Sequence, residues 1–191
     1  KRQELISVKD NDEILKIKKN NLFKYSPHDK LGSIFKVNDS INNHITDILN
    51  LPIINVSAIK HCNFSGVVDG INSSGGIAVP MLLEKLNVDV KKINCTPNGI
   101  FTHNPEPLKE NLTELCDVVK KNKSNFGIAV DPDVDRLVFV DERGEMFGEE
   151  YTLVACSDYV LSKSPGSIVS NLSSSVSYTH LGAHETVLHL V

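Results

Sequence analysis

Three aspartates stand at alternate positions in one short stretch of this sequence, as Asp131, Asp133 and Asp135. Apolar, β-prone runs flank the stretch at residues 126–130 and 137–140. Such runs are typical of strands, so we expect the acidic residues in a loop that joins two strands. Carboxylates that converge there would repel one another strongly unless a cation lay between them. The stretch therefore predicts a cation-binding loop.

The residue types in this loop indicate which cation and which ligand to expect. Hard carboxylate oxygens suit Mg²⁺, which accepts a few carboxylates and completes its coordination with water or phosphate oxygens. We therefore predict that Asp131, Asp133 and Asp135 bind Mg²⁺. Arg136 follows them directly, and its planar guanidinium suits a phosphate or a sugar hydroxyl.

Other interpretations of the loop remain open. It could be a solvated acidic turn, or a non-catalytic module that binds Ca²⁺ or a sugar phosphate. An EF-hand counted from Asp131 would place Glu142 at the last ligand position, but Arg136 stands where the sharp turn needs glycine. A haloacid-dehalogenase-like phosphatase with Asp131 as nucleophile is disfavoured, because its D-x-D loop is expected near the first strand of the fold.

Composition argues against several classes of partner. The 191 residues carry a net charge of −4 and a pI near 6.0, so there is no basic footprint for nucleic acid or an anionic membrane. No apolar run approaches membrane-spanning length. The four cysteines are widely spaced and no secretory leader is visible, so we expect reduced thiols and a cytoplasmic location.

Hydrophobic periodicity predicts an α/β fold. Strands are expected at residues 64–69, 88–95 and 126–130, and the intervening segments 77–86 and 108–121 have the pattern of helices. Strands that alternate with helices form βαβ units, so we predict three layers around a mixed, largely parallel sheet. Further helices are expected at residues 12–20, 40–49 and 149–163, and a further strand at 167–172.

Two other features have a functional and a structural interpretation. The turn at residues 70–76 could cradle a phosphate at a helix N-terminus, but it lacks the dinucleotide and P-loop spacings, so we favour a structural turn. His103 has no second metal-ligating residue at a suitable spacing, so we interpret it as a loop histidine.

Four segments together resemble the α-D-phosphohexomutases, the family of phosphomannomutase, phosphoglucomutase and phosphoglucosamine mutase. The most specific is Asp131–Leu137, which is similar to the family's D-x-D-x-D-R metal loop. The supporting segments are Val67–Gly70, Phe101–Pro107 and Gly144–Glu149. The resemblance covers residues 23–175, approximately.

The resemblance implies that the three aspartates bind Mg²⁺, that Arg136 contacts the phosphosugar, and that a phosphoserine oxygen from another domain completes the metal site. In that family the phosphoserine phosphorylates the sugar, and the resulting bisphosphate returns its other phosphate to the serine. The family commonly has glycine between the aspartates, whereas Pro132 and Val134 stand here. These substitutions are expected to stiffen the loop without removing a ligand.

The family's plan implies a division of residues 1–175 into three parts. Residues 1–39 would be the end of domain I and a linker, 40–143 the metal-binding domain II, and 144–175 a truncated start of the similar domain III. The phosphoserine loop would be missing, so this chain would hold no catalytic residue and would be inactive alone. Thr102 lies in a T-H-N-P string that resembles the serine loop, but it stands within the same βαβ repeat as the metal loop, so we do not expect it to be the nucleophile.

Residues 176–191 depart from the family pattern. His180, His184 and His189 could be interpreted as a metal cluster. The string also resembles a translated sequencing adapter, so we interpret residues 176–191 as a non-native tail. The sequence indicates neither the oligomeric state nor whether the hexose phosphate derives from glucose, mannose or glucosamine.

Overall fold

The computed structural model describes residues 6–170 and 189–190. The chain divides into two compact units, residues 1–38 and 39–191. The predicted tail therefore lies outside the described residues except for the short strand β7 (His189–Leu190).

The first unit contains helix α1 (Val8–Lys19) and a single 3₁₀ turn, η1 (His28–Lys30). Helix α1 begins four residues before the expected start at Asp12 because Ser7 caps it. The Ser7 hydroxyl oxygen accepts a hydrogen bond from the Asp10 backbone N–H at 3.2 Å, and the Asp10 carboxylate in turn accepts one from the Ser7 backbone N–H at 3.3 Å. This reciprocal arrangement is a capping box. No residue of α1 is buried.

A five-stranded sheet organises the second unit, in the spatial order β2-β1-β3-β4-β5. Strands β1, β2 and β3 are parallel to one another, whereas β4 is antiparallel to both β3 and β5. The strands are β1 (Ser65–Asp69), β2 (Asp89–Ile93), β3 (Phe126–Val130), β4 (Leu137–Asp141) and β5 (Met146–Phe147). The predicted mixed, largely parallel sheet is confirmed.

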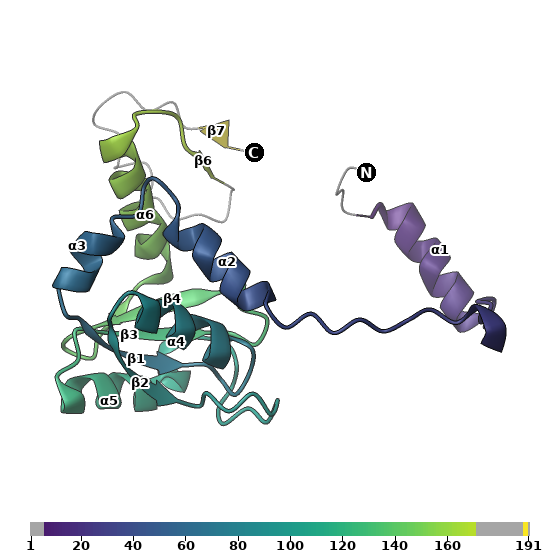
Figure 1. The fold of residues 1–191 in the computed structure, drawn as a ribbon, viewed down its shortest axis with the longest axis horizontal. Coiled ribbons are helices and arrows are strands. Elements are labelled where there is room, and N and C mark those ends of the chain that lie inside the picture. Colours follow the sequence, from purple (N-terminus) through teal and green to yellow (C-terminus); the bar gives the residue numbers. More distant parts are fainter. Residues whose placement is uncertain (1–5, 171–188, 191) are drawn as a thin grey trace. The chain divides into compact units, whose positions relative to one another are not determined.

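Helices cover both faces of this sheet (Figure 1). Helix α4 (Gly75–Lys85) connects β1 to β2 and packs on both, and α5 (Thr113–Asn122) packs on β1, β3 and β4. Helix α6 (Glu149–Lys163) contacts β4, and α2 (Ser40–Leu49) packs on α4. The expected βαβ units are therefore present. Two short elements complete the unit, helix α3 (Val56–His61) and β6 (Val169–Ser170), which pairs with β7.

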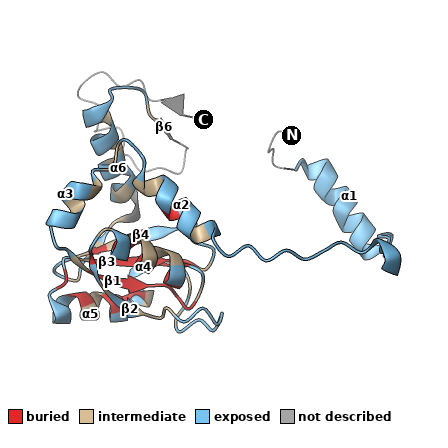
Figure 2. Cartoon of the chain, in the orientation of Figure 1, coloured by how far each residue is buried: buried red, intermediate tan, exposed pale blue. Residues whose placement is uncertain are grey.

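The core lies on the two faces of the central strands, where Figure 2 shows most of the buried residues. Successive residues of a strand point to opposite faces. Val67 accordingly packs with Leu115 and Val119 of α5, and Val68 packs with Leu83 of α4. Because both faces are covered, the central strands carry continuous apolar runs, which is the pattern that predicted them.

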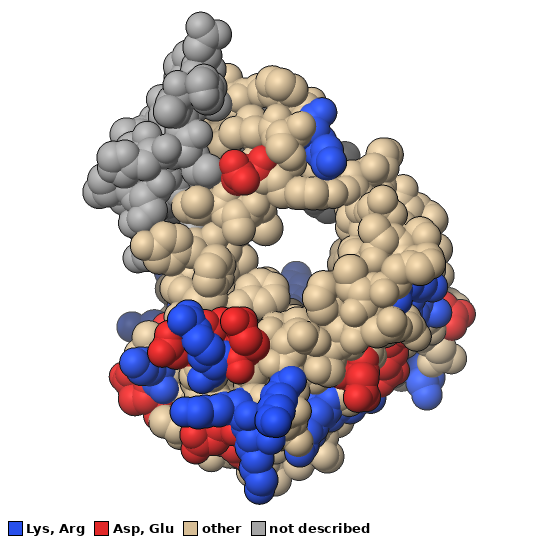
Figure 3. Space-filling view, turned by 90° about the vertical axis from the view of Figure 1, so that its left-hand side faces the viewer, with Lys and Arg blue, Asp and Glu red and all other residues tan. Residues whose placement is uncertain are grey.

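The outer strand β2 is charged rather than apolar. Lys91 donates to the side chain of Asn122 at 3.1 Å, and Lys92 pairs with Glu84 at 2.7 Å. Lysines on an edge strand hinder pairing with another chain. Figure 3 shows that charged side chains of both signs gather over the lower part of the face it draws.

Two further helical segments differ from the sequence predictions. The expected helix 108–121 is divided into a 3₁₀ turn, η2 (Lys109–Asn111), and α5, because Leu112 leaves helical geometry between them. Helix α3 was not predicted. Among the described residues, no helix is both long enough and apolar enough to cross a membrane.

Candidate metal centre

The acidic loop, residues 131–136, connects β3 to β4. These strands pair antiparallel, with Val130 opposite Leu137, so the six residues close a hairpin. The predicted setting between two strands is therefore confirmed. The loop leaves the sheet at the carboxyl end of β3, where the parallel neighbour β1 also ends, at Asp69.

The three aspartates converge as the sequence predicted. One carboxylate oxygen from each of Asp131, Asp133 and Asp135 lies within 4.8 Å of the others. An ion with bonds of about 2.1 Å needs ligand oxygens no more than about 4.2 Å apart, so small side-chain rotations would suffice. Asp131 is only 7 % exposed, whereas Asp133 and Asp135 face solvent. The set fits a hard cation that keeps part of its coordination open.

The closeness of these carboxyl groups shifts the pKa values of Asp131 and Asp135 in opposite directions. Burial by itself raises the pKa of Asp131, but its carboxylate accepts hydrogen bonds from the Arg136 backbone N–H and the Asp135 carboxyl, and the net pKa is lowered. The pKa of Asp135 is raised, first by that shared hydrogen bond with Asp131 and then by the negative charge of Asp133. This divergence is typical of carboxylates that share a small volume.

Backbone geometry within the loop is unusual at Val134. This β-branched residue has φ of +61°, in the left-handed region that favours glycine. Its backbone N–H donates to the Asp131 carbonyl oxygen at 3.2 Å, which tightens the turn. The position is one where the resembled family commonly has glycine, so valine here implies backbone strain.

The glycine-containing turn at residues 70–76 follows the neighbouring strand β1 and contacts the acidic loop. The Ser73 hydroxyl donates to the Pro132 carbonyl oxygen at 2.6 Å. A side chain at Gly76 would place Cβ 2.7 Å from the Cys95 Cα, so this part of the turn has no room for one. These contacts agree with the structural interpretation of the turn.

Arg136 is engaged by a partner that the sequence did not indicate. Its Nη1 contacts Oε1 of Glu106, and its Nε lies 4.0 Å from Oδ1 of Asp135. The charge of Glu106, followed by the hydrogen bond to it, raises the pKa of the Arg136 guanidinium. The backbone N–H of Arg136 donates to Asp131 at 3.1 Å, so the arginine joins the metal loop, through its backbone, to Glu106, through its side chain.

A buried polar network beside the metal loop was missed from the sequence. Asp69 is 1 % exposed, and its carboxylate accepts hydrogen bonds from the Ile71 backbone N–H at 3.0 Å, from Asn94 at 3.2 Å and from His103 at 3.1 Å. His103 is thus more than a loop histidine, because it joins the 101–107 segment to the end of β1. Thr102 beside it is exposed.

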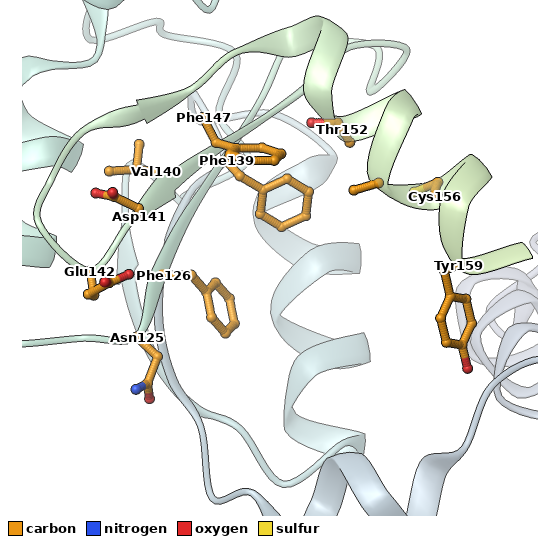
Figure 4. A pocket seen from close by; sticks show the side chains of 11 residues that line it. Asn125, Phe126, Phe139, Val140, Asp141, Glu142, Phe147, Thr152, Cys156 and Tyr159 are labelled. Carbon is orange, nitrogen blue, oxygen red and sulfur yellow. The ribbon is translucent and has the colours of Figure 1, made fainter. Parts of the chain in front are cut away.

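A mostly apolar hollow lies away from the acidic loop. It has a volume of about 500 Å³ and is lined by Phe126, Phe139 and Phe147, with Cys156 and Tyr159 of α6 facing them (Figure 4). Phe126 begins β3, at the end of the β3–β4 hairpin opposite the acidic loop. The walls of this hollow are mostly apolar, and we assign the hollow no catalytic role.

Comparison with known proteins identifies a family for the domain that carries this loop. Residues 42–144, more than half of the chain, match the model for phosphoglucomutase/phosphomannomutase, alpha/beta/alpha domain II. A phosphoglucomutase/phosphomannomutase of Thermococcus kodakarensis is 36 % identical over 141 residues, which are 73 % of this chain and 30 % of that protein. A phosphoglucosamine mutase of Methanococcus maripaludis is 30 % identical over 161 residues, which are 81 % of this chain and 34 % of that protein.

The fold is also that of a solved relative. A crystal structure of a phosphoglucomutase/phosphomannomutase family protein from Burkholderia thailandensis superposes with a TM-score of 0.72 at 20 % identity, covering 97 % of this chain and 39 % of that one. The chain therefore spans roughly a third of the length of the relatives it matches.

Proposed function

Because the chain belongs to the phosphoglucomutase/phosphomannomutase family, we propose that it is the metal-binding part of a Mg²⁺-dependent phosphohexomutase. The observation that carries this proposal is the convergence of Asp131, Asp133 and Asp135 within 4.8 Å at the end of a family-matched hairpin. The reaction would move a phosphoryl group between two positions of a hexose.

Each residue of the loop has a distinct part in this proposal. Asp131, buried and fixed by the Arg136 backbone, anchors the site, and the exposed Asp133 and Asp135 complete the protein's ligand set. Bound Mg²⁺ supplies charge neutralisation at a transferring phosphoryl group, which is most of what phosphoryl transfer requires of a protein. Arg136 donates its guanidinium N–H groups to a phosphate of the sugar.

The remaining chemistry is assigned to groups outside this chain. Residues 40–143 are proposed as the metal-binding domain II, residues 1–39 as the end of domain I and a linker, and 144–175 as the opening of domain III. The phosphoserine that donates the phosphoryl group, and the loop that selects the sugar, would come from other domains. We accordingly propose that this chain alone does not turn over a hexose phosphate, and that residues 176–191 are a non-native tail.

The experiment is a mutase assay on the longer protein encoded at the source locus, with glucose, mannose and glucosamine phosphates as substrates. We expect Mg²⁺-dependent turnover, and a loss in kcat on the order of 100-fold or more for Asp133→Asn. Asp89→Asn is the matched control, because Asp89 is also exposed but begins β2, away from the loop. Full activity of Asp133→Asn would contradict the proposal. Ca²⁺ binding in preference to Mg²⁺, with no turnover, would favour a binding module.

A further inference from the structure

Glu106 and Arg136 are thirty residues apart in the chain, and their side chains form an ion pair beside the metal loop. Glu106 lies in the 101–107 segment between β2 and α5, and Arg136 closes the acidic loop. The two side chains are 49 % and 44 % exposed. The pair therefore joins two surface loops and is not part of the core.

Several contacts hold the backbone on the Glu106 side in place. The Glu106 N–H donates to the Asn104 side chain at 3.1 Å, and its carbonyl oxygen accepts a hydrogen bond from the Asn111 side chain at 2.8 Å. Pro105 and Pro107 flank it and fix two further φ angles. The hydrogen bond from His103 to Asp69 ties the same segment to β1. The carboxylate of Glu106 is thus presented from a rigid support.

The ion pair between Glu106 and Arg136 is not explained by folding stability, because an exposed ion pair contributes little to the free energy of unfolding. What a fixed carboxylate does provide is orientation. A guanidinium has five N–H donors in a planar fork. Glu106 occupies the Nη1 corner of Arg136, while the Nε corner is 4.0 Å from Asp135, beyond hydrogen-bond distance. Donors of the half-exposed guanidinium therefore remain available to a second anion.

We propose that Glu106 is a positioning residue, which holds one corner of the Arg136 guanidinium so that its remaining N–H groups are set to receive a phosphate at the acidic loop. The inference rests on the proposed function for the role of Arg136. It adds that the 101–107 segment takes part in phosphate recognition through a residue that does not itself touch the phosphate.

The test is a titration of the 191-residue chain with inorganic phosphate in the presence of Mg²⁺, followed through the NMR signal of the Arg136 Nε–H group. Glu106→Ala removes the anchor, and Glu106→Gln keeps an acceptor oxygen at the same place without the charge. Glu145→Ala is the matched control, because Glu145 pairs with Arg143 at 3.4 Å at the other end of β4.

We expect Glu106→Ala to raise the Kd for phosphate about three- to fivefold and to shift the Arg136 signal, as the loss of one exposed charged contact implies. Glu106→Gln should restore the Kd to within about twofold. Glu145→Ala should change neither quantity.

Opposite results would overturn the inference. Tighter phosphate binding by both Glu106 variants would show that the only effect of Glu106 is to repel the phosphate anion through its negative charge. An unchanged Kd, or no phosphate binding by the unaltered chain, would remove the positioning role. Unfolding of Glu106→Ala, with altered binding in the folded Glu106→Gln variant, would assign Glu106 a structural role. Since the titration requires no turnover, each of these results is separate from the mutase assay of the longer protein.

Discussion

The Nε2 atom of His103 lies 3.1 Å from Oδ2 of Asp69, and this contact joins the 101–107 segment to the carboxyl end of the central strand β1. Asp69 is buried, and its other hydrogen bonds come from Ile71 and Asn94. A carboxylate with several donors at the end of a core strand fixes the loops around it. The network therefore supports the metal loop and the Glu106 segment without belonging to the ligand set.

Removing the Asp69 carboxylate should destabilise the fold. In Asp69→Ala, the donors of Ile71, Asn94 and His103 lose their acceptor in a buried setting, so we expect a loss of about 2–3 kcal/mol in the free energy of unfolding. Urea denaturation measures it. The exposed Asp117→Ala variant should stay within about 0.5 kcal/mol of the unaltered chain. A similarly small change for Asp69→Ala would show that the network is not a stabilising one.

Replacing Val134 should relieve backbone strain. A non-glycine residue in the left-handed region costs about 1–2 kcal/mol, and asparagine tolerates that region better than valine does. We expect Val134→Asn to raise the free energy of unfolding by about 1 kcal/mol, measured by urea denaturation in the absence of Mg²⁺. Val134→Ala keeps an unfavourable Cβ and loses the valine methyl groups, so it should bring no gain. An equal gain from both variants would assign the effect to something other than φ.

Mg²⁺ should stabilise the chain through the acidic loop. A ligand that binds only the folded state adds about 2.7 kcal/mol at a concentration one hundred times its Kd. We expect Tm to rise with MgCl₂, and Asp133→Asn to abolish most of that rise. NaCl at equal ionic strength separates binding from screening. Without Mg²⁺, Asp133→Asn should be slightly more stable than the unaltered chain, because it removes a like charge from the cluster. An identical response to both salts would be evidence against a specific site.

Acid should weaken the β4–β5 turn through Asp141. The pKa of Asp141 is lowered in the fold, first by the hydrogen bond from the Glu145 backbone N–H and then by that from the Arg143 side chain. A lowered carboxyl pKa contributes stability that is present above the unfolded value of about 3.9 and is lost as the pH falls through the folded value.

The variant Asp141→Asn tests this pH dependence. It should be less stable than the unaltered chain at pH 7, and the difference should shrink as the pH falls below about 4, since protonated Asp141 resembles asparagine. Urea denaturation at pH 7 and at pH 3 measures the two differences. A difference that stays constant across this range would show that the charge of Asp141 is not what the turn uses.

Structural features that depend on a short, continuous stretch of residues were predictable from the sequence. Helix Ser40–Leu49 and strand Phe126–Val130 have the expected bounds, because periodicity and flanking residues define them locally. The convergence of the three aspartates was likewise predictable, since one hairpin loop contains them all.

Contacts between distant loops were not predictable in this way. The pairs Asp69–His103 and Glu106–Arg136 join residues more than twenty-five positions apart, and no local pattern states which loops will meet. The only signal was that Asp69, His103 and Glu106 lie within the segments that carried the family resemblance. Helix α3 was missed because it has a single turn or so of regular pattern, although Asn55 caps it through the Ala58 N–H at 3.0 Å.

The β3–β4 hairpin also bears on the order in which the protein assembles. Every carboxylate of the cluster comes from one loop of six residues, closed by strands that are neighbours in sequence. Closing so short a loop costs little chain entropy and takes far less time than bringing β1 beside β3, because α4, β2 and α5 lie between those two strands in the chain. The ion-binding turn can thus form early in folding as one continuous peptide, before the Ser73 and Glu106 contacts that hold it in the finished fold.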